Sequence, residues 1–119
     1  IDKRIAGVIA SGSVGQLSET ISQRGCEGGD GIVPEFLKWF ESADLAAMHA
    51  PRLFIAISGK NDHIFPFGGA KGVVDEARDF YELIGASSNI HAVEGSDGHR
   101  YYGNLSWKFF RDQVQSEIS

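Results

Sequence analysis

The sequence has a single cysteine, Cys26, among its 119 residues. A disulfide within the chain is therefore impossible, and the count argues against a metal site built from thiolates. Cys26 lies in the glycine-rich stretch 25–31 and has no obvious base near it in sequence. We interpret this stretch as a turn rather than as the site of a nucleophilic thiol, because a reactive cysteine needs a neighbour that favours its thiolate.

Long apolar runs and an excess of positive charge are also missing. No run approaches the roughly 20 residues of a membrane span, and no signal peptide is recognisable, so the cellular location stays open. The 11 Lys and Arg against 16 Asp and Glu give a formal net charge of −5, which offers no electrostatic reason to bind nucleic acid or an anionic membrane. The remaining composition is that of a folded globular domain, and a small neutral or polar substrate is the easiest ligand to accommodate.

Three segments have the character of buried strands, at residues 5–10, 53–57 and 90–93. The first two are nearly continuous apolar runs, from Ile5 to Ala10 and from Leu53 to Ile57. Such runs are typical of parallel strands that helices cover on both faces.

Helical spacing of apolar residues follows the second and third of these segments. One stripe runs from Val73 to Ile84, and Gly85 is placed to end that helix. A second stripe runs through a final helix from Trp107 to Ile118, and we assign Trp107 to the core. Asn104 or Ser106 is the expected cap of the final helix.

The region before the second strand is less regular. Two short helices are expected between residues 34 and 50, with Ser42 as the cap of the second. Residues 12–31 are interpreted as a long loop, either a plain surface loop or one that shapes a substrate site. The order of elements predicts an α/β fold with a parallel sheet of about three strands and flanking helices, and residues 1–119 as a single domain.

Two ionisable residues follow the second and third strands in tight turns that contain glycine. Asp62 lies in the turn after the second strand, and His99 in the turn after the third. Reactive groups of parallel sheets collect at the carboxyl ends of strands, and neighbouring strands lie only about 5 Å apart. We therefore expect Asp62 to reach the imidazole of His99, as the acid and the histidine of a catalytic triad do.

Other residues compete for these roles. Asp97 is a possible partner of His99, but a residue two positions away in a tight turn usually points elsewhere, so Asp62 is preferred. His63 with Asp62 and His99 would be a weak metal-ligand set, and no metal or cofactor is predicted. Ser13 in the segment 11–15 has only a superficial likeness to a nucleophile elbow, because Ser11 stands where the first glycine belongs.

Segments 43–52, 58–66 and 98–102 resemble the final third of α/β-hydrolases of the acetyl xylan esterase and dienelactone-hydrolase-like group. The most specific parts are the Asp-x-x-Phe-Pro turn that begins at Asp62 and the Gly-His-Arg-Tyr turn that contains His99. The resemblance implies that Asp62 and His99 are the acid and the histidine of a catalytic triad. It also implies a nucleophile elbow, Gly-x-Ser-x-Gly, before the strand at 5–10, and the sequence contains none there.

This resemblance gives the expected function. A complete hydrolase of this type needs roughly twice the present length, so we expect the chain to be the carboxyl-terminal part of a serine-type carboxylic ester hydrolase. The chain alone is expected to be inactive. Two alternatives stay open: a prolyl-oligopeptidase-like peptidase, and a hydrolase-derived module that binds a ligand or partner without catalysis.

The strand at 5–10 also suggests a partner. In a complete sheet it would have a neighbour on each side, and nothing between Ile5 and Ser11 supplies the charge or proline that protects natural sheet edges. We expect the chain to self-associate through this strand, or to bind the missing amino-terminal half there, unless the 12–31 segment covers the edge.

Overall fold

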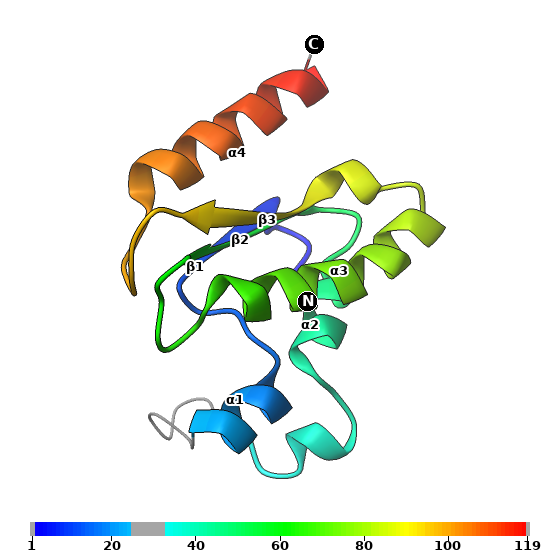
Figure 1. The fold of residues 1–119 in the computed structure, drawn as a ribbon. Coiled ribbons are helices and arrows are strands. Elements are labelled where there is room, and N and C mark those ends of the chain that lie inside the picture. Colours follow the sequence, from blue (N-terminus) through cyan, green and yellow to red (C-terminus); the bar gives the residue numbers. More distant parts are fainter. Residues whose placement is uncertain (1, 25–32, 119) are drawn as a thin grey trace.

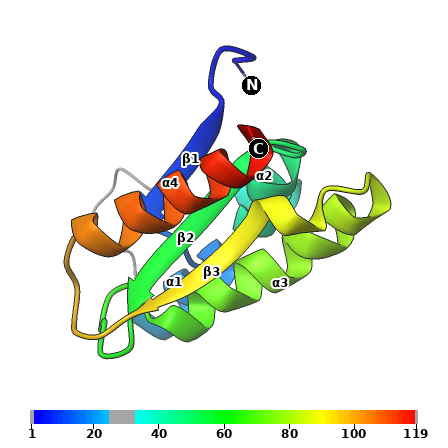
Figure 2. The same ribbon diagram turned by 90° about the horizontal axis from the view of Figure 1, so that it is seen from above.

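The computed structural model of the chain describes residues 2–24 and 33–118. Its centre is a sheet of three parallel strands, β1 (Gly7–Ser11), β2 (Leu53–Gly59) and β3 (Ile90–Gly95), in the order β1-β2-β3. Helices lie on both faces of this sheet (Figures 1 and 2). The predicted α/β class and parallel three-stranded sheet are therefore confirmed. The first strand begins two residues later than expected, at Gly7.

Two helices cover one face of the sheet, and a third covers the opposite face. On one face lie α2 (Ser42–Met48) and the long α3 (Phe67–Leu83), and α4 (Gly103–Ile118) lies on the other (Figure 1). The remaining elements are α1 (Leu17–Arg24) and two short 3₁₀ helices, η2 (Phe36–Lys38) and η3 (Ser87–Asn89). This layering divides the apolar interior into two cores, one on each side of the sheet.

The core under α3 is the larger one. Val73, Val74 and Tyr81 are completely buried there, and the Tyr81 hydroxyl donates a 2.8 Å hydrogen bond to the carbonyl oxygen of Arg52. On the other face, β2 contributes the fully buried Ile55 and Ile57 beneath α4. Burial of these apolar side chains provides most of the driving force for the fold.

The predicted apolar stripe of α3 is only partly right. Phe80 and Ile84, assigned to the buried face, are 46% and 47% exposed, and Ile84 lies just past the last helical residue, Leu83. The helix also begins earlier than the stripe, with Pro66 as its N-cap. Gly85 does follow its end, with a φ of 73° that favours glycine.

The long loop expected at residues 12–31 is wrong for part of its length, since α1 occupies Leu17–Arg24. A side chain from another segment helps to hold the start of this helix. Glu41 accepts hydrogen bonds from the backbone N–H groups of Leu17 and Ser18, and so satisfies donors at the start of α1. Glu41, not Ser42, also caps α2, in a capping box with Asp44. Cys26 lies outside the described residues.

Two expectations about the final helix, the burial of Trp107 and the position of the cap, are wrong. Trp107 is 52% exposed and therefore does not belong to the core, although its ring meets that of Phe110 edge-on. The helix begins at Gly103, so Asn104 and Ser106 lie inside it rather than at its cap. Ser106 is fully buried, and its hydroxyl donates to the carbonyl oxygen of Gly103.

β1 is an edge strand. Its residues pair with β2, Gly7 opposite Leu53 and Ser11 opposite Ile57, and its other edge faces no strand of the described residues. All five of its residues are only half-buried, in contrast to β2. Instead of lying along that edge, α1 lies beneath the sheet, on the side of α3 (Figure 1). Within 2–24 and 33–118, no helix is long and apolar enough to cross a bilayer.

Candidate active site

Asp62 lies in the turn that leaves β2 and leads into α3. Its carboxylate is completely buried. The backbone N–H groups of Ile64 and Phe65 each donate a 2.8 Å hydrogen bond to Oδ1. This side-chain-to-backbone turn is a conformation that aspartate favours. It fixes one carboxylate oxygen and leaves the other, Oδ2, for a different partner.

That partner is His99, in the turn between β3 and α4. Its Nδ1 lies 2.9 Å from Oδ2 of Asp62, and its side chain is 44% exposed. The predicted contact between the two side chains is confirmed. Beside a carboxylate, Nδ1 carries the hydrogen, so the neutral ring has Nε2 free to accept a proton.

The charge of Asp62 is stabilised by its hydrogen bonds. Burial works to raise its pKa, but the hydrogen bonds from the Phe65 N–H, from His99 and from the Ile64 N–H more than compensate. The net effect holds the pKa of Asp62 below its ordinary value, and the group is a carboxylate near neutral pH. A buried anion beside an accessible imidazole is the arrangement that orients histidine as a general base.

The competing site residues lie elsewhere. The carboxylate of Asp97 accepts from the Gly98 N–H and, at 3.4 Å, from Arg100, so it is not the partner of His99. His63 is exposed. No group of three or more metal-ligating side chains occurs in the part of the chain that the structure describes.

No serine hydroxyl in the described ranges is hydrogen-bonded to His99. Ser13 lines a groove of about 300 Å³ with Val8, Leu45 and His49 on the α2 side of the sheet. Ser11 accepts a hydrogen bond from the Tyr102 N–H, and Ser58 is fully buried within β2. The arrangement therefore offers an acid and a base, without a positioned nucleophile among these residues.

Two residues near His99 were not predicted from the sequence. The ring of Phe65 lies 6.2 Å from the imidazole, measured between centroids, in a tilted arrangement. Gly12 adopts a φ of 66°, and a Cβ there would lie 3.4 Å from Cε1 of His99. A glycine directly after a strand is the sequence signal for such a close backbone approach.

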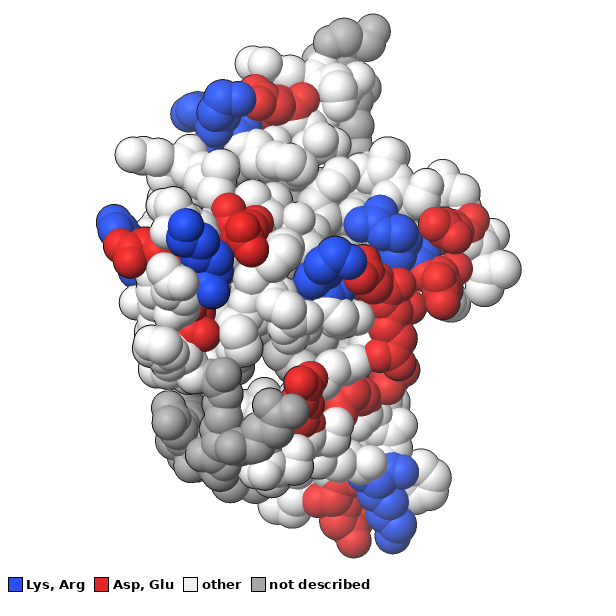
Figure 3. Space-filling view, in the orientation of Figure 1, with Lys and Arg blue, Asp and Glu red and all other residues white. Residues whose placement is uncertain are grey.

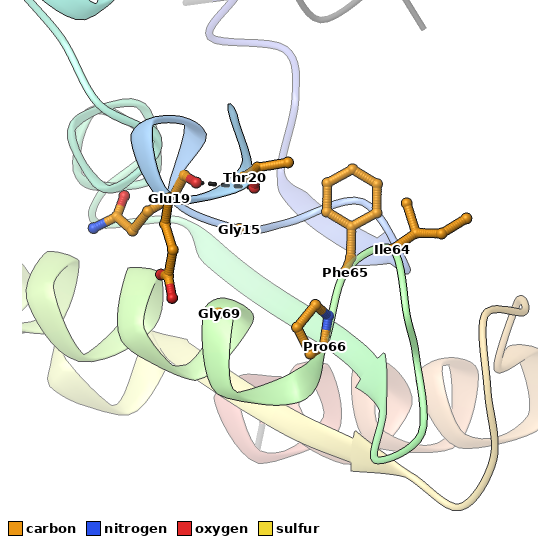
Figure 4. A pocket seen from close by; sticks show the side chains of 8 residues that line it. Gly15, Glu19, Thr20, Ile64, Phe65, Pro66 and Gly69 are labelled. Atoms are coloured by element: carbon orange, nitrogen blue, oxygen red, sulfur yellow. Dashed lines mark hydrogen bonds between the residues drawn. The ribbon is translucent and has the colours of Figure 1, made fainter. Parts of the chain in front are cut away.

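A small hollow lies beside Phe65, between α1 and the start of α3 (Figure 4). Gly15, Thr20, Phe65 and Gly69 are among its lining residues, and its volume is about 30 Å³. Pockets for small-molecule ligands are on the order of 300–1,000 Å³. The hollow has room for one or two waters, not for a substrate.

Charges are mixed on the face that Figure 3 shows. Lysine and arginine side chains lie at separate places among aspartate and glutamate side chains, several of which adjoin one another, and no broad basic area appears. Several of the ion pairs are local, such as Lys71 with Asp75 and Lys108 with Asp112. Exposed pairs of this kind contribute little to stability, and they offer no focus for a polyanion on this face.

Comparison with known proteins leaves the relationship open: no protein-family model, no curated protein and no solved structure matches this chain.

Proposed function

We propose that this chain supplies the acid and the histidine of a serine-type carboxylic ester hydrolase with an α/β-hydrolase fold. The observation that carries the proposal is the buried carboxylate of Asp62 hydrogen-bonded to Nδ1 of the half-exposed His99. Further support comes from the position of both residues just past the carboxyl ends of adjacent parallel strands, and from the sequence resemblance at the two turns. The nucleophile and the oxyanion hole are proposed to lie outside these 119 residues.

In the proposed reaction, the serine oxygen attacks the ester carbonyl while Nε2 of His99 takes the serine proton. Asp62 stabilises the resulting imidazolium through Nδ1. The imidazolium then donates its proton to the leaving alcohol, which departs as the acyl-enzyme forms. Water repeats the sequence: His99 takes its proton, the hydroxide attacks the acyl carbon, and the serine recovers a proton as the acid leaves.

The proposed substrate is a small ester. Acetylated sugars are suggested by the family resemblance alone. An assay of the full gene product against acetyl esters and prolyl peptides separates an esterase from a prolyl-oligopeptidase-like peptidase.

The test is serine-directed labelling with a fluorophosphonate probe. The 119-residue chain alone is expected to remain unlabelled. The complete gene product is expected to be labelled at a serine before Ile1, within Gly-x-Ser-x-Gly, and to lose labelling in the His99→Ala variant. His63→Ala is the matched control, since His63 is exposed beside Asp62.

Labelling of the isolated chain at Ser11 or Ser13 would contradict the proposed division of the site. A start codon near Ile1 would instead favour a non-catalytic binding module.

A further inference from the structure

Tyr102 lies at the end of the turn that carries His99, where β3 gives way to α4. It is only 9% exposed and packs in the core beneath α4, with Ile55 and Ile57. We propose that Tyr102 is a positioning residue, which holds the His99 turn in the conformation that brings the imidazole to Asp62. The importance of this role for catalysis rests on the function proposed above.

The hydroxyl of Tyr102 forms two hydrogen bonds with the backbone of this turn. It donates a 2.7 Å hydrogen bond to the carbonyl oxygen of Gly98 and accepts one of 3.2 Å from the Asp97 N–H. Gly98 is the residue directly before His99. The hydroxyl therefore fixes the backbone immediately ahead of the imidazole, although it does not touch the ring.

Two glycines allow the tyrosine to lie this close. A Cβ at Gly95 would lie 2.5 Å from Cε1 of Tyr102, and one at Gly59 would overlap its hydroxyl and the carbonyl oxygen of Asp97. Real atoms do not approach at such distances, so only glycine fits at either position. The ring thus lies directly against the backbones where β2 and β3 end.

The same turn is bonded to the turn that carries Asp62. The Lys60 N–H donates to the carbonyl oxygen of Gly95 at 2.9 Å, and the Asn61 N–H donates to that of Asp97 at 3.1 Å. Because the Tyr102 hydroxyl also accepts from the Asp97 N–H, it stabilises the backbone through which the two turns meet. A shift of the His99 turn would have to break these bonds together.

The third strand end is connected as well. The Tyr102 N–H donates a 3.1 Å hydrogen bond to Oγ of Ser11, the last residue of β1. Tyr102 therefore contacts the carboxyl ends of all three strands. Arg100 lies over its ring at 5.8 Å, but both Arg100 and its partner Asp97 are exposed, so this contact contributes little.

The experiment measures which imidazole nitrogen of His99 carries the proton, from ¹⁵N chemical shifts at about pH 8, where an ordinary imidazole is neutral. The wild-type chain is expected to be mainly the Nδ1–H tautomer, which the Asp62 contact selects. In Tyr102→Phe the ring packing stays and the two hydroxyl bonds are lost. The Nδ1–H to Nε2–H ratio should fall roughly fivefold, the factor that corresponds to about 1 kcal/mol for one net hydrogen bond.

Tyr101→Phe is the matched control, since that side chain is 60% exposed, and it should leave the ratio unchanged. Ser11→Ala is the second variant: it removes the acceptor of the Tyr102 N–H without altering the ring, and a lower ratio is expected again. If Tyr102→Phe folds poorly, the ratio measured for Ser11→Ala tests the positioning role instead.

The possible outcomes separate the two proposals. A wild-type Nδ1–H majority that neither Tyr102→Phe nor Ser11→Ala reduces overturns the role of Tyr102 and leaves the Asp62–His99 pair intact. A wild-type Nε2–H majority contradicts the pair itself, and with it both proposals. A ratio that falls as expected, in a protein whose full gene product resists fluorophosphonate, supports the positioning role while the hydrolase function fails.

Discussion

Oδ2 of Asp62 lies 2.9 Å from Nδ1 of His99, although the two residues are 37 positions apart in the chain. The register of the sheet explains this contact. Gly59 is opposite Gly95 at the carboxyl ends of β2 and β3, and each strand enters its turn directly after that glycine. The two side chains meet because both turns start from the same level of the sheet.

Asp62→Asn should lower the free energy of unfolding near neutral pH by about 1–3 kcal/mol, because a buried charge-assisted hydrogen bond is lost. The folded state holds the pKa of Asp62 below its ordinary value of 3.8. The contribution of the carboxylate is therefore complete above that value and disappears as the pH falls through the lower, folded-state pKa. Urea unfolding of both proteins across this range measures the difference. Asp75→Asn, at an exposed ion pair, is the control, and a pH-independent difference for Asp62→Asn would contradict the prediction.

Gly59→Ala and Gly72→Ala should have opposite effects. At Gly59 an added Cβ would overlap the backbone of the His99 turn, and we expect a loss of about 3 kcal/mol or more. At Gly72, in the exposed middle of α3, a Cβ meets nothing within 4 Å, and higher helix propensity should add about 0.5–1 kcal/mol. Thermal unfolding monitored by circular dichroism measures both. A stable Gly59→Ala protein would show that the turn lies farther from β2.

His49 should make the fold sensitive to mild acid. Its Nε2 is buried without a hydrogen-bond partner, and burial, assisted by the charge of Arg52, lowers its pKa below 6.5. Below pH 6.5 the unfolded chain takes up a proton that the folded one does not, so stability falls until the folded-state pKa is reached.

His49→Leu should preserve stability near neutral pH or raise it by up to about 1 kcal/mol, since it removes an unsatisfied buried group. It should also reduce the loss in acid. Burial lowers the pKa of His91 as well, so His49→Leu combined with His91→Leu should flatten the acid dependence further. Denaturant unfolding at several pH values tests this, and an unchanged slope in the double variant would contradict it.

The open edge of β1 leads us to propose that the 119-residue chain self-associates at micromolar concentration. Val8 lies on this strand and is half-buried in the groove beside it, so Val8→Lys should weaken association at least about tenfold by placing a charge at the edge. Ile84→Lys is the control at an exposed site near the end of α3. Sedimentation velocity measures the association, and a wild-type chain that remains a 12.9 kDa monomer would refute the proposal.

The sequence by itself determined the strands, the class of fold and the two side chains of the candidate pair. Apolar runs such as 53–57 can be buried only between two layers, and an aspartate or histidine in a glycine turn after such a run lies at the functional edge of a parallel sheet. These inferences depend on local pattern and on the geometry that all parallel sheets share. They required no knowledge of which side chains meet.

Only the tertiary structure decided which residues are covered and what supports the pair. Trp107 and Phe80 have the spacing of core residues, yet they are 52% and 46% exposed. Glu41 caps α1 from a distant segment, and Tyr102 fits against Gly59 and Gly95 through contacts between different strands. Periodicity shows that a side chain can be buried; whether it is depends on how the elements pack, which no local window of sequence contains.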